Sequence, residues 1–207
     1  SLYGEEGQFA GWAQGVGCGF RGFGSGGLGV LYDENGNDTY QAGEFSQGAG
    51  YFFGLGLLFD QSGNDTYRGR RYAQGTAAHQ AVGLLVDAGG DDRYTTKSAA
   101  SQGAAWDAAI GYLEDRAGDD IYRGKDLSQG AAAMNSWGIL VDRMGRDLYW
   151  AQSGQAQGSS TTYWGGRNAL NFGILIDLGD QIDSYNQTGR RNHSTQKMPG
   201  IGLFLDR

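Results

Sequence analysis

The amino-acid sequence predicts an all-β fold, a parallel β-solenoid (three-sided β-helix) of about seven coils of about 27 residues. First, a unit of the pattern G-x-L-x-D-x-x-G-x-D-x-Y returns along the whole chain, with its clearest copy at residues 56–67. Second, a glutamine follows the tyrosine, usually seven or eight residues later and usually before a glycine. Third, successive copies of the first aspartate are 27, 27, 28, 27, 35 and 29 residues apart. Such a fixed period is the signature of stacked coils that share one core.

Composition narrows the class of protein. The repeat crosses every possible boundary, so residues 1–207 are expected to form a single β-solenoid domain. The 39 glycines follow no strict triplet, which excludes collagen, and 13% aromatic residues argue against disorder. A net charge of −7 disfavours nucleic-acid binding. No apolar run reaches the roughly 18–20 residues that a membrane-spanning helix needs, so we expect no membrane insertion.

The two ends of the sequence fall inside a coil. Ser1-Leu2-Tyr3 aligns with Asp147-Leu148-Tyr149, and the chain stops at Asp206-Arg207, in mid-repeat. Solenoids need capping units to protect their terminal strands, and neither end resembles one. We therefore expect a fragment of a longer repeat protein.

The first strand of each coil carries G-x-L-x-D. Its central position is never polar and is expected to face the core: Leu31, Leu58, Leu85, Leu113, Leu140, Leu175 and Phe204. Residues on either side of it point the other way in a strand. These flanking pairs are Val30/Tyr32, Leu57/Phe59, Leu84/Val86, Tyr112/Glu114, Ile139/Val141, Ile174/Ile176 and Leu203/Leu205. A strand that is apolar on both faces is normally covered on both.

The remaining strands of a coil follow from the other repeated residues. The second strand carries D-x-Y, and the third begins at Gln-Gly and continues through small residues. Stacked tyrosines and glutamines are expected to form structural ladders inside the solenoid. Two inserts, at residues 15–29 and 159–171, break the period and are expected to form loops.

Two aspartate columns carry the candidate chemistry. They are Asp33, Asp60, Asp87, Asp115, Asp142 and Asp177, and Asp38, Asp65, Asp92, Asp120, Asp147 and Asp183. Stacked about 4.8 Å apart, neighbouring carboxylates repel by about 3.5 kcal/mol at an effective dielectric constant of 20. Bound Ca²⁺ would offset this repulsion, because Ca²⁺ takes carboxylate and carbonyl oxygens as ligands. Hydrogen bonds from turn amides, or hydration of an outer column, are the alternatives.

The turn sequences resemble a known family. SGNDTY (residues 62–67), GGDDRY (89–94) and AGDDIY (117–122) are similar to the calcium-binding nonapeptide of RTX (repeats-in-toxin) proteins. The match covers about nine residues of each 27, and the first glycine of the motif is usually replaced, as by Ser62 and Met144. The resemblance implies Ca²⁺ between the coils of a parallel β-roll. It also implies a bacterial protein that is secreted or held at the cell surface.

A basic cluster follows the tyrosine in three consecutive coils. It consists of Arg68, Arg70, Arg71, Lys97, Arg123 and Lys125. One interpretation is a binding site for an anionic polysaccharide. The other is a solvated edge, with Glu44 and Asp126 as ion-pair partners.

Three classes of function remain open. The leading one is a structural or adhesive module of a secreted or cell-surface protein, possible with or without calcium. The alternatives are a carbohydrate-binding module and a β-helix polysaccharide lyase or hydrolase, which the fold alone does not license. His79 and Asp107 stand at equivalent positions of adjacent coils, but no nucleophile repeats there, which argues against an enzyme.

The apolar flanks of the first strand indicate a partner. Over seven coils they form a continuous stripe, larger than the apolar surface that soluble monomers usually expose. The inserts are only six and seven residues longer than the repeat requires, too short to cover it. We therefore expect lateral association with other copies of the chain or with other domains of the parent protein.

Overall fold

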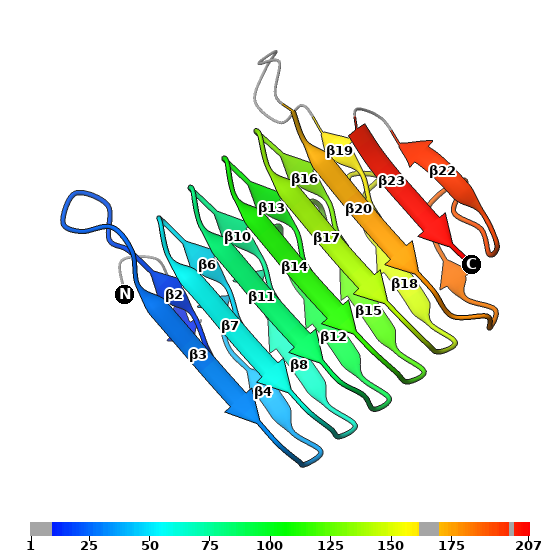
Figure 1. The fold of residues 1–207 in the computed structure, drawn as a ribbon, viewed down its shortest axis with the longest axis horizontal. Helices are drawn as coiled ribbons and strands as arrows, with labels where there is room; N and C mark the ends of the chain where they lie inside the picture. The colour runs from blue at the N-terminus through cyan, green and yellow to red at the C-terminus, as the bar shows by residue number, and fades with distance from the viewer. Residues whose placement is uncertain (1–9, 162–169, 199–200) are drawn as a thin grey trace.

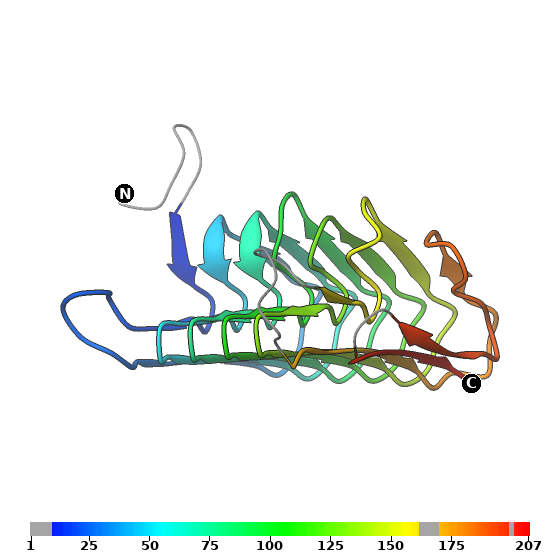
Figure 2. The same ribbon diagram turned by 90° about the horizontal axis from the view of Figure 1, so that it is seen from above.

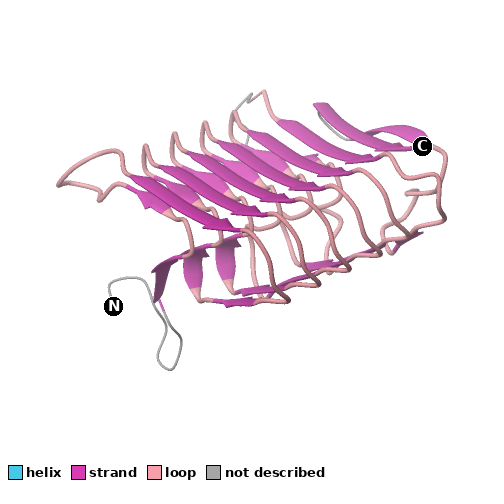
Figure 3. Cartoon of the chain, turned by 60° about the horizontal axis from the view of Figure 1, so that its bottom comes forward, coloured by secondary structure: helices cyan, strands magenta, loops and turns pink. Residues whose placement is uncertain are grey.

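The computed structural model describes residues 10–161, 170–198 and 201–207. This part of the chain is an all-β parallel solenoid without helices, as predicted, and its coils stack into a rod (Figures 1 and 3). It contains no helix that is long and apolar enough to span a membrane. Ser1-Leu2-Tyr3, which the sequence aligns with a later coil, lies outside the described residues.

Four sheets run along the rod. The long sheet contains β3 (Leu28–Asp33), β7 (Leu55–Asp60), β11 (Val82–Asp87), β14 (Ile110–Asp115), β17 (Trp137–Asp142), β20 (Phe172–Asp177) and β23 (Ile201–Asp206). The tyrosine sheet contains β4 (Thr39–Gln41), β8 (Thr66–Gly69), β12 (Arg93–Thr96), β15 (Ile121–Gly124), β18 (Leu148–Ala151) and β21 (Ser184–Tyr185). The alanine sheet contains β2 (Gly17–Cys18), β6 (Gly50–Tyr51), β10 (Ala77–Ala78), β13 (Ala105–Trp106), β16 (Ala132–Ala133) and β19 (Ser160–Thr161).

The fourth sheet was not predicted. It is a short sheet of β1 (Ala10–Ala13), β5 (Glu44–Ser46) and β9 (Arg71–Ala73), between the tyrosine and the glutamine of the first coils. Each of its strands carries an aromatic residue two positions before the glutamine (Trp12, Phe45 and Tyr72), and these rings stack, but the later coils lack this residue. The coil count also differs slightly. The tyrosine and alanine sheets have six strands each, which makes about six complete turns and a seventh long strand.

The long sheet and the alanine sheet lie so close that their backbones touch (Figure 2). The Leu84 amide donates to the Gly48 carbonyl of the other layer at 2.9 Å. A Cβ atom on Gly83 would lie 2.2 Å from the Thr76 carbonyl oxygen, and one on Gly75 would lie 2.0 Å from that of Tyr112. Gly75 also has a φ of +70°. Glycine is therefore required where the two layers meet.

The core fills the space between the long sheet and the tyrosine sheet. The predicted inward column from Leu58 to Phe204 is fully buried, and the half-buried Leu31 packs against its first member. Beside it the tyrosine rings stack nearly parallel, with centroids 4.8 Å apart for Tyr67 and Tyr94 and 4.9 Å for Tyr94 and Tyr122. These columns confirm the structural interpretation of the leucine and tyrosine repeats.

The glutamine column holds the coils together from inside. Gln74 has a φ of +60°, and its Nε2 donates to the Tyr67 carbonyl at 3.0 Å and to the Thr95 carbonyl of the next coil at 3.2 Å. Gln47, Gln102 and Gln129 make the same pair of bonds. The glutamine is therefore structural, as predicted.

The C-terminal edge of the long sheet is capped, which corrects the expectation that neither end carries a cap. Strand β22 (Thr195–Met198) pairs antiparallel with β23 and forms the outermost strand (Figure 1). Of the two inserts, residues 19–27 form a loop closed by a hydrogen bond from the Phe20 amide to the Gly24 carbonyl. Most of the second insert, residues 162–169, lies outside the described residues.

Candidate metal centre

The first aspartate column lies at the C-terminal ends of the long strands and is buried from Asp60 onward. Each carboxylate from Asp60 to Asp177 accepts a hydrogen bond from the tyrosine hydroxyl of the preceding coil. Tyr94 donates to Asp115 Oδ2 at 2.7 Å, and Asp115 Oδ1 also accepts the Ala117 amide at 3.2 Å. The same tyrosine bond joins Tyr40 to Asp60, Tyr67 to Asp87, Tyr122 to Asp142 and Tyr149 to Asp177.

The second aspartate column begins each tyrosine strand. The backbone amide of each member up to Asp147 donates to Oδ1 of the equivalent aspartate in the next coil, whereas the amide of Asp183 donates to Asn192 Oδ1. Asp65 donates to Asp92 at 2.5 Å, and Asp92 donates to Asp120 at 2.6 Å. Asp120 to Asp147 and Asp147 to Asp183 repeat the bond at 2.7 Å. Backbone amides thus satisfy one oxygen of each carboxylate from Asp65 to Asp183, as the turn-amide alternative required.

The other oxygen of these carboxylates has no partner. Oδ2 of each member from the second coil onward is buried and makes no hydrogen bond with any described residue: Asp65, Asp92, Asp120, Asp147 and Asp183. Their exposed fractions are only 1% for Asp65, Asp92 and Asp120, 2% for Asp147 and 6% for Asp183. A buried acceptor left unpaired is costly, more so when it is charged.

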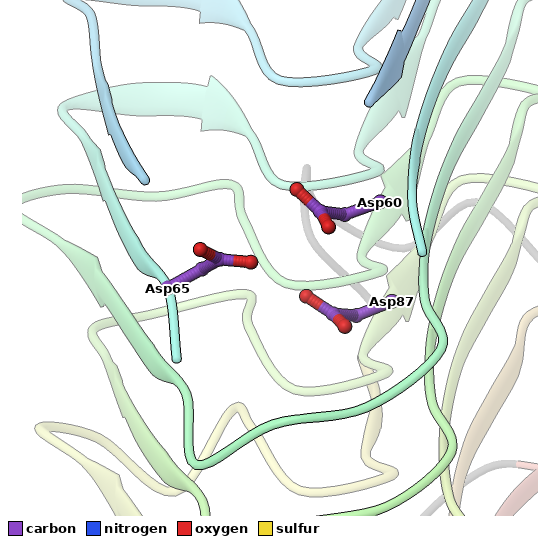
Figure 4. Close-up of side chains that lie close together, drawn as sticks. All are labelled: Asp60, Asp65 and Asp87. Carbon is purple, nitrogen blue, oxygen red and sulfur yellow. The ribbon is translucent and has the colours of Figure 1, made fainter. Parts of the chain in front are cut away.

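The two columns meet inside the rod. Asp65 lies opposite Asp60 and Asp87, and the three carboxylates point toward one another (Figure 4). One oxygen from each member of the group lies within 4.8 Å of the others. Three further groups have this geometry: Asp87/Asp92/Asp115, Asp120/Asp142/Asp147 and Asp147/Asp177/Asp183.

Burial makes ionisation of the second column unfavourable. Desolvation raises the pKa of Asp65 to about 7, of Asp92 to about 8 and of Asp120 to about 10. It likewise raises the pKa of Asp147 to about 8 and of Asp183 to about 7. Neighbouring carboxylates add to the shift, Asp87 beside Asp92 for example. The column is therefore neutralised either by protons or by cations.

The donor set fits a hard cation. Every group consists of carboxylates, without histidine or cysteine, and oxygen ligands suit Ca²⁺ and Mg²⁺ rather than zinc or copper. Each coil contributes one aspartate from each column, so one divalent cation per coil would balance the charge. The unpaired Oδ2 atoms are the oxygens that such an ion would take as ligands.

The ends of the columns differ from the middle. Asp33 and Asp38 in the first coil are only half-buried and belong to none of the four groups. Asp206 was not among the predicted ligands, although it ends the last copy of the repeat. It is buried and accepts the Tyr185 hydroxyl at 2.8 Å, so it extends the first column.

The chain matches no family model, no curated protein and no solved structure. Function therefore has to be argued from the geometry of its own residues.

The predicted basic cluster contains two arginines in ion pairs and four exposed cationic residues. Arg70 and Arg71 form ion pairs with Glu44 at 2.8 and 3.0 Å, and the Glu44 side chain is only 2% exposed. The other four members are exposed: Arg68, Lys97, Arg123 and Lys125. Arg68 and Arg123 lie in one column of the tyrosine sheet, separated by Thr95. The predicted ion pairs with Glu44 are therefore present for Arg70 and Arg71. The other four cationic side chains face solvent.

The histidine–aspartate pair is formed as expected. His79 Nδ1 lies 2.5 Å from Asp107 Oδ2, between the rings of Tyr51 and Trp106. Burial lowers the pKa of His79 below its usual value. The hydrogen bonds of the described residues give this pair no hydroxyl or thiol partner. Burial also raises the pKa of the Cys18 thiol to about 11, which disfavours the reactive thiolate.

Proposed function

We propose that this chain is a structural β-solenoid module of a secreted or cell-surface bacterial protein, stabilised by Ca²⁺ bound along its aspartate columns. The observation that carries the proposal is the repeated, buried and unpaired Oδ2 of the second column, whose carboxylates meet those of the first column in each group. The resemblance of the turns to RTX repeats supports both the metal and the location. Extracellular modules that bind calcium need dissociation constants of only about 10⁻⁴–10⁻³ M.

Calcium would stabilise the rod for an electrostatic reason. Two ionised carboxylates about 4.8 Å apart repel by about 3.5 kcal/mol at an effective dielectric constant of 20, and this repulsion recurs along the buried columns. A divalent ion placed among three of these carboxylates turns the repulsion into attraction. Because the sites form only in the folded coil, binding adds to the free energy of unfolding, by about 2.7 kcal/mol for one site at a hundredfold excess over its dissociation constant.

Thermal unfolding in calcium and in excess chelator tests the proposal. We expect a higher Tm in calcium, together with saturable binding of Ca²⁺ measured by titration calorimetry. Asp92→Asn should remove part of the calcium-dependent rise in Tm. Asp126→Asn is the matched control, because this exposed aspartate lies outside the columns. Equal Tm values for the unmodified protein in calcium and in chelator would contradict the proposal.

A second candidate function is binding of an anionic polysaccharide. The observation that favours it is a pocket with aromatic, cationic and amide groups, lined by Arg71, Tyr72, Ser98, Ala99, Ala100, Trp106, Asp126, Leu127 and Gln155. The exposed Lys97 and Lys125 are next to pocket residues in the sequence. Together they offer a ring-stacking surface and charges of the required sign.

A glycan array tests this second candidate. We expect binding to uronic-acid or sulfated glycans, and loss of that binding in the variant Arg68→Ala/Lys97→Ala/Lys125→Ala. The control is Arg191→Ala/Lys197→Ala/Arg207→Ala, which removes three exposed charges elsewhere on the chain. An unmodified protein that binds no anionic glycan would contradict the candidate function without affecting the calcium proposal.

A further inference from the structure

The outer face of the long sheet is almost wholly apolar. Its outward residues are the first, third and fifth of each strand, and 20 of these 21 are aliphatic or aromatic. They are Leu28, Val30, Tyr32, Leu55, Leu57, Phe59, Val82, Leu84, Val86, Ile110, Tyr112, Trp137, Ile139, Val141, Phe172, Ile174, Ile176, Ile201, Leu203 and Leu205, with Glu114 as the exception. Leu28 is 71% exposed and Val30 56%.

The size of this outer face exceeds what a soluble monomer usually exposes. Seven strands about 4.8 Å apart, each of six residues at about 3.3 Å, cover about 34 Å by 20 Å, or roughly 670 Å². The largest apolar patch on a typical monomer is about 300–600 Å². Two such faces packed together would remove roughly 1,300 Å² from water, within the range of about 1,200–2,000 Å² of stable interfaces.

Its charge pattern is that of an interface with a neutral centre and a polar rim. Glu114, the only charged residue among the outward positions, is 5% exposed. Its carboxylate accepts Arg143 Nε at 2.6 Å, Arg116 Nε at 3.2 Å and the Tyr112 hydroxyl at 2.9 Å. Both arginines follow the ends of their strands, so the counter-charges come from the rim of the face.

We propose that the outer face of the long sheet packs against the same face of a second copy of this chain. Ridges of side chains repeat along it at the strand spacing of about 4.8 Å, and an identical face offers grooves of the same period. Sheets that pack face to face bury interdigitated apolar side chains in this way. The area matches that of a stable dimer, and the one charged residue of the face, Glu114, is paired with arginines of its own chain.

The polar cluster at Glu114 defines the register. Strand β14 is the fourth of the seven parallel strands, and Tyr112 stands at its third position, the centre of the outer face. In a two-fold dimer centred on the face, β14 of one copy lies over β14 of the other, and Tyr112 approaches its own equivalent. A shift by one coil would place Glu114 against aliphatic side chains of the partner.

Sedimentation velocity over a range of concentrations tests the pairing. We expect a dimer for the unmodified protein and a monomer for the variant Leu84→Lys/Ile139→Lys. The circular dichroism spectra of the two proteins should agree, which shows that the variant is folded. The matched control, Ile121→Lys/Trp150→Lys, makes the same kind of change on outward residues of the tyrosine sheet and should remain dimeric. If the unmodified protein is a monomer at about 100 µM, the proposal is overturned. Binding of that monomer to vesicles or to a partner domain would overturn it equally.

Disulfide trapping gives a second readout that needs no lysine variant to fold. In a Cys18→Ser background, Tyr112→Cys should cross-link to its equivalent under mild oxidation, because it lies at the centre of the proposed dimer. Leu28→Cys, at a corner of the face, should cross-link much less. Equal cross-linking of the two variants would overturn the centred register, and no cross-linking of either would overturn the face-to-face dimer.

Discussion

The hydroxyl of Tyr94 donates a hydrogen bond to Asp115 Oδ2 of the next coil at 2.7 Å. Both residues are fully buried. This bond therefore connects the tyrosine sheet to the long sheet and one coil to the next. Because the same bond recurs along the rod, the tyrosine column supplies a hydrogen bond to each buried aspartate from Asp60 to Asp177.

Removing one of these hydroxyls should destabilise the rod. Tyr94→Phe leaves a buried oxygen of Asp115 without its donor, and we expect the free energy of unfolding to fall by about 1–3 kcal/mol. Urea unfolding measures the change. Tyr32→Phe is the control, because the Tyr32 hydroxyl bonds Gln61 at the surface, and its loss should cost less than about 0.5 kcal/mol. Equal losses in the two variants would count against a stabilising role for the buried bond.

Stability without metal should rise as the pH falls. Burial raises the pKa of Asp65 to about 7 and of Asp92 to about 8, from the ordinary aspartate value of 3.8. Between pH 3.8 and 8 the folded chain therefore binds more protons than the unfolded chain. This contribution to stability is fully present below the unfolded pKa and is lost as the pH rises through the folded pKa.

The measurement is chemical unfolding in chelator at pH 5, 6, 7 and about 8, repeated in calcium. In chelator we expect the free energy of unfolding to decrease steadily toward high pH. Calcium should weaken this dependence, because the ion replaces the protons on the same carboxylates. A free energy of unfolding that does not change with pH in chelator would show that these carboxylates are not desolvated in the folded chain.

A methyl group should not fit between the two closely packed layers. Gly83→Ala would bring a Cβ atom within 2.2 Å of the Thr76 carbonyl oxygen, which belongs to backbone and cannot rotate away. We expect a loss of about 3 kcal/mol or more in the free energy of unfolding. Gly154→Ala is the control, because the nearest atom to its added Cβ would be Gln187 Oε1 at 3.8 Å. A Gly83→Ala variant as stable as this control would show that the layers can separate.

The sequence predicted the contacts between the repeated residues that stack along the rod axis. A period of about 27 residues places each residue beside its equivalent in the next coil, and the long strands do pair in this register, Leu85 with Leu58 and Leu113. The buried leucine column, the stacked tyrosines and the His79–Asp107 contact all follow from this rule. In each case the contact joins equivalent positions of adjacent coils.

Contacts between different sheets, perpendicular to the rod axis, were decided only by the tertiary structure. Asp65 and Asp87 are 22 residues apart, and their meeting depends on how the long and tyrosine sheets fold around the core. The same holds for burial of the aspartate columns, for the short sheet and for the capping strand β22. The physical reason is that a repeat fixes the stacking of equivalent residues, whereas the shape of one coil depends on turns and packing that no periodicity encodes.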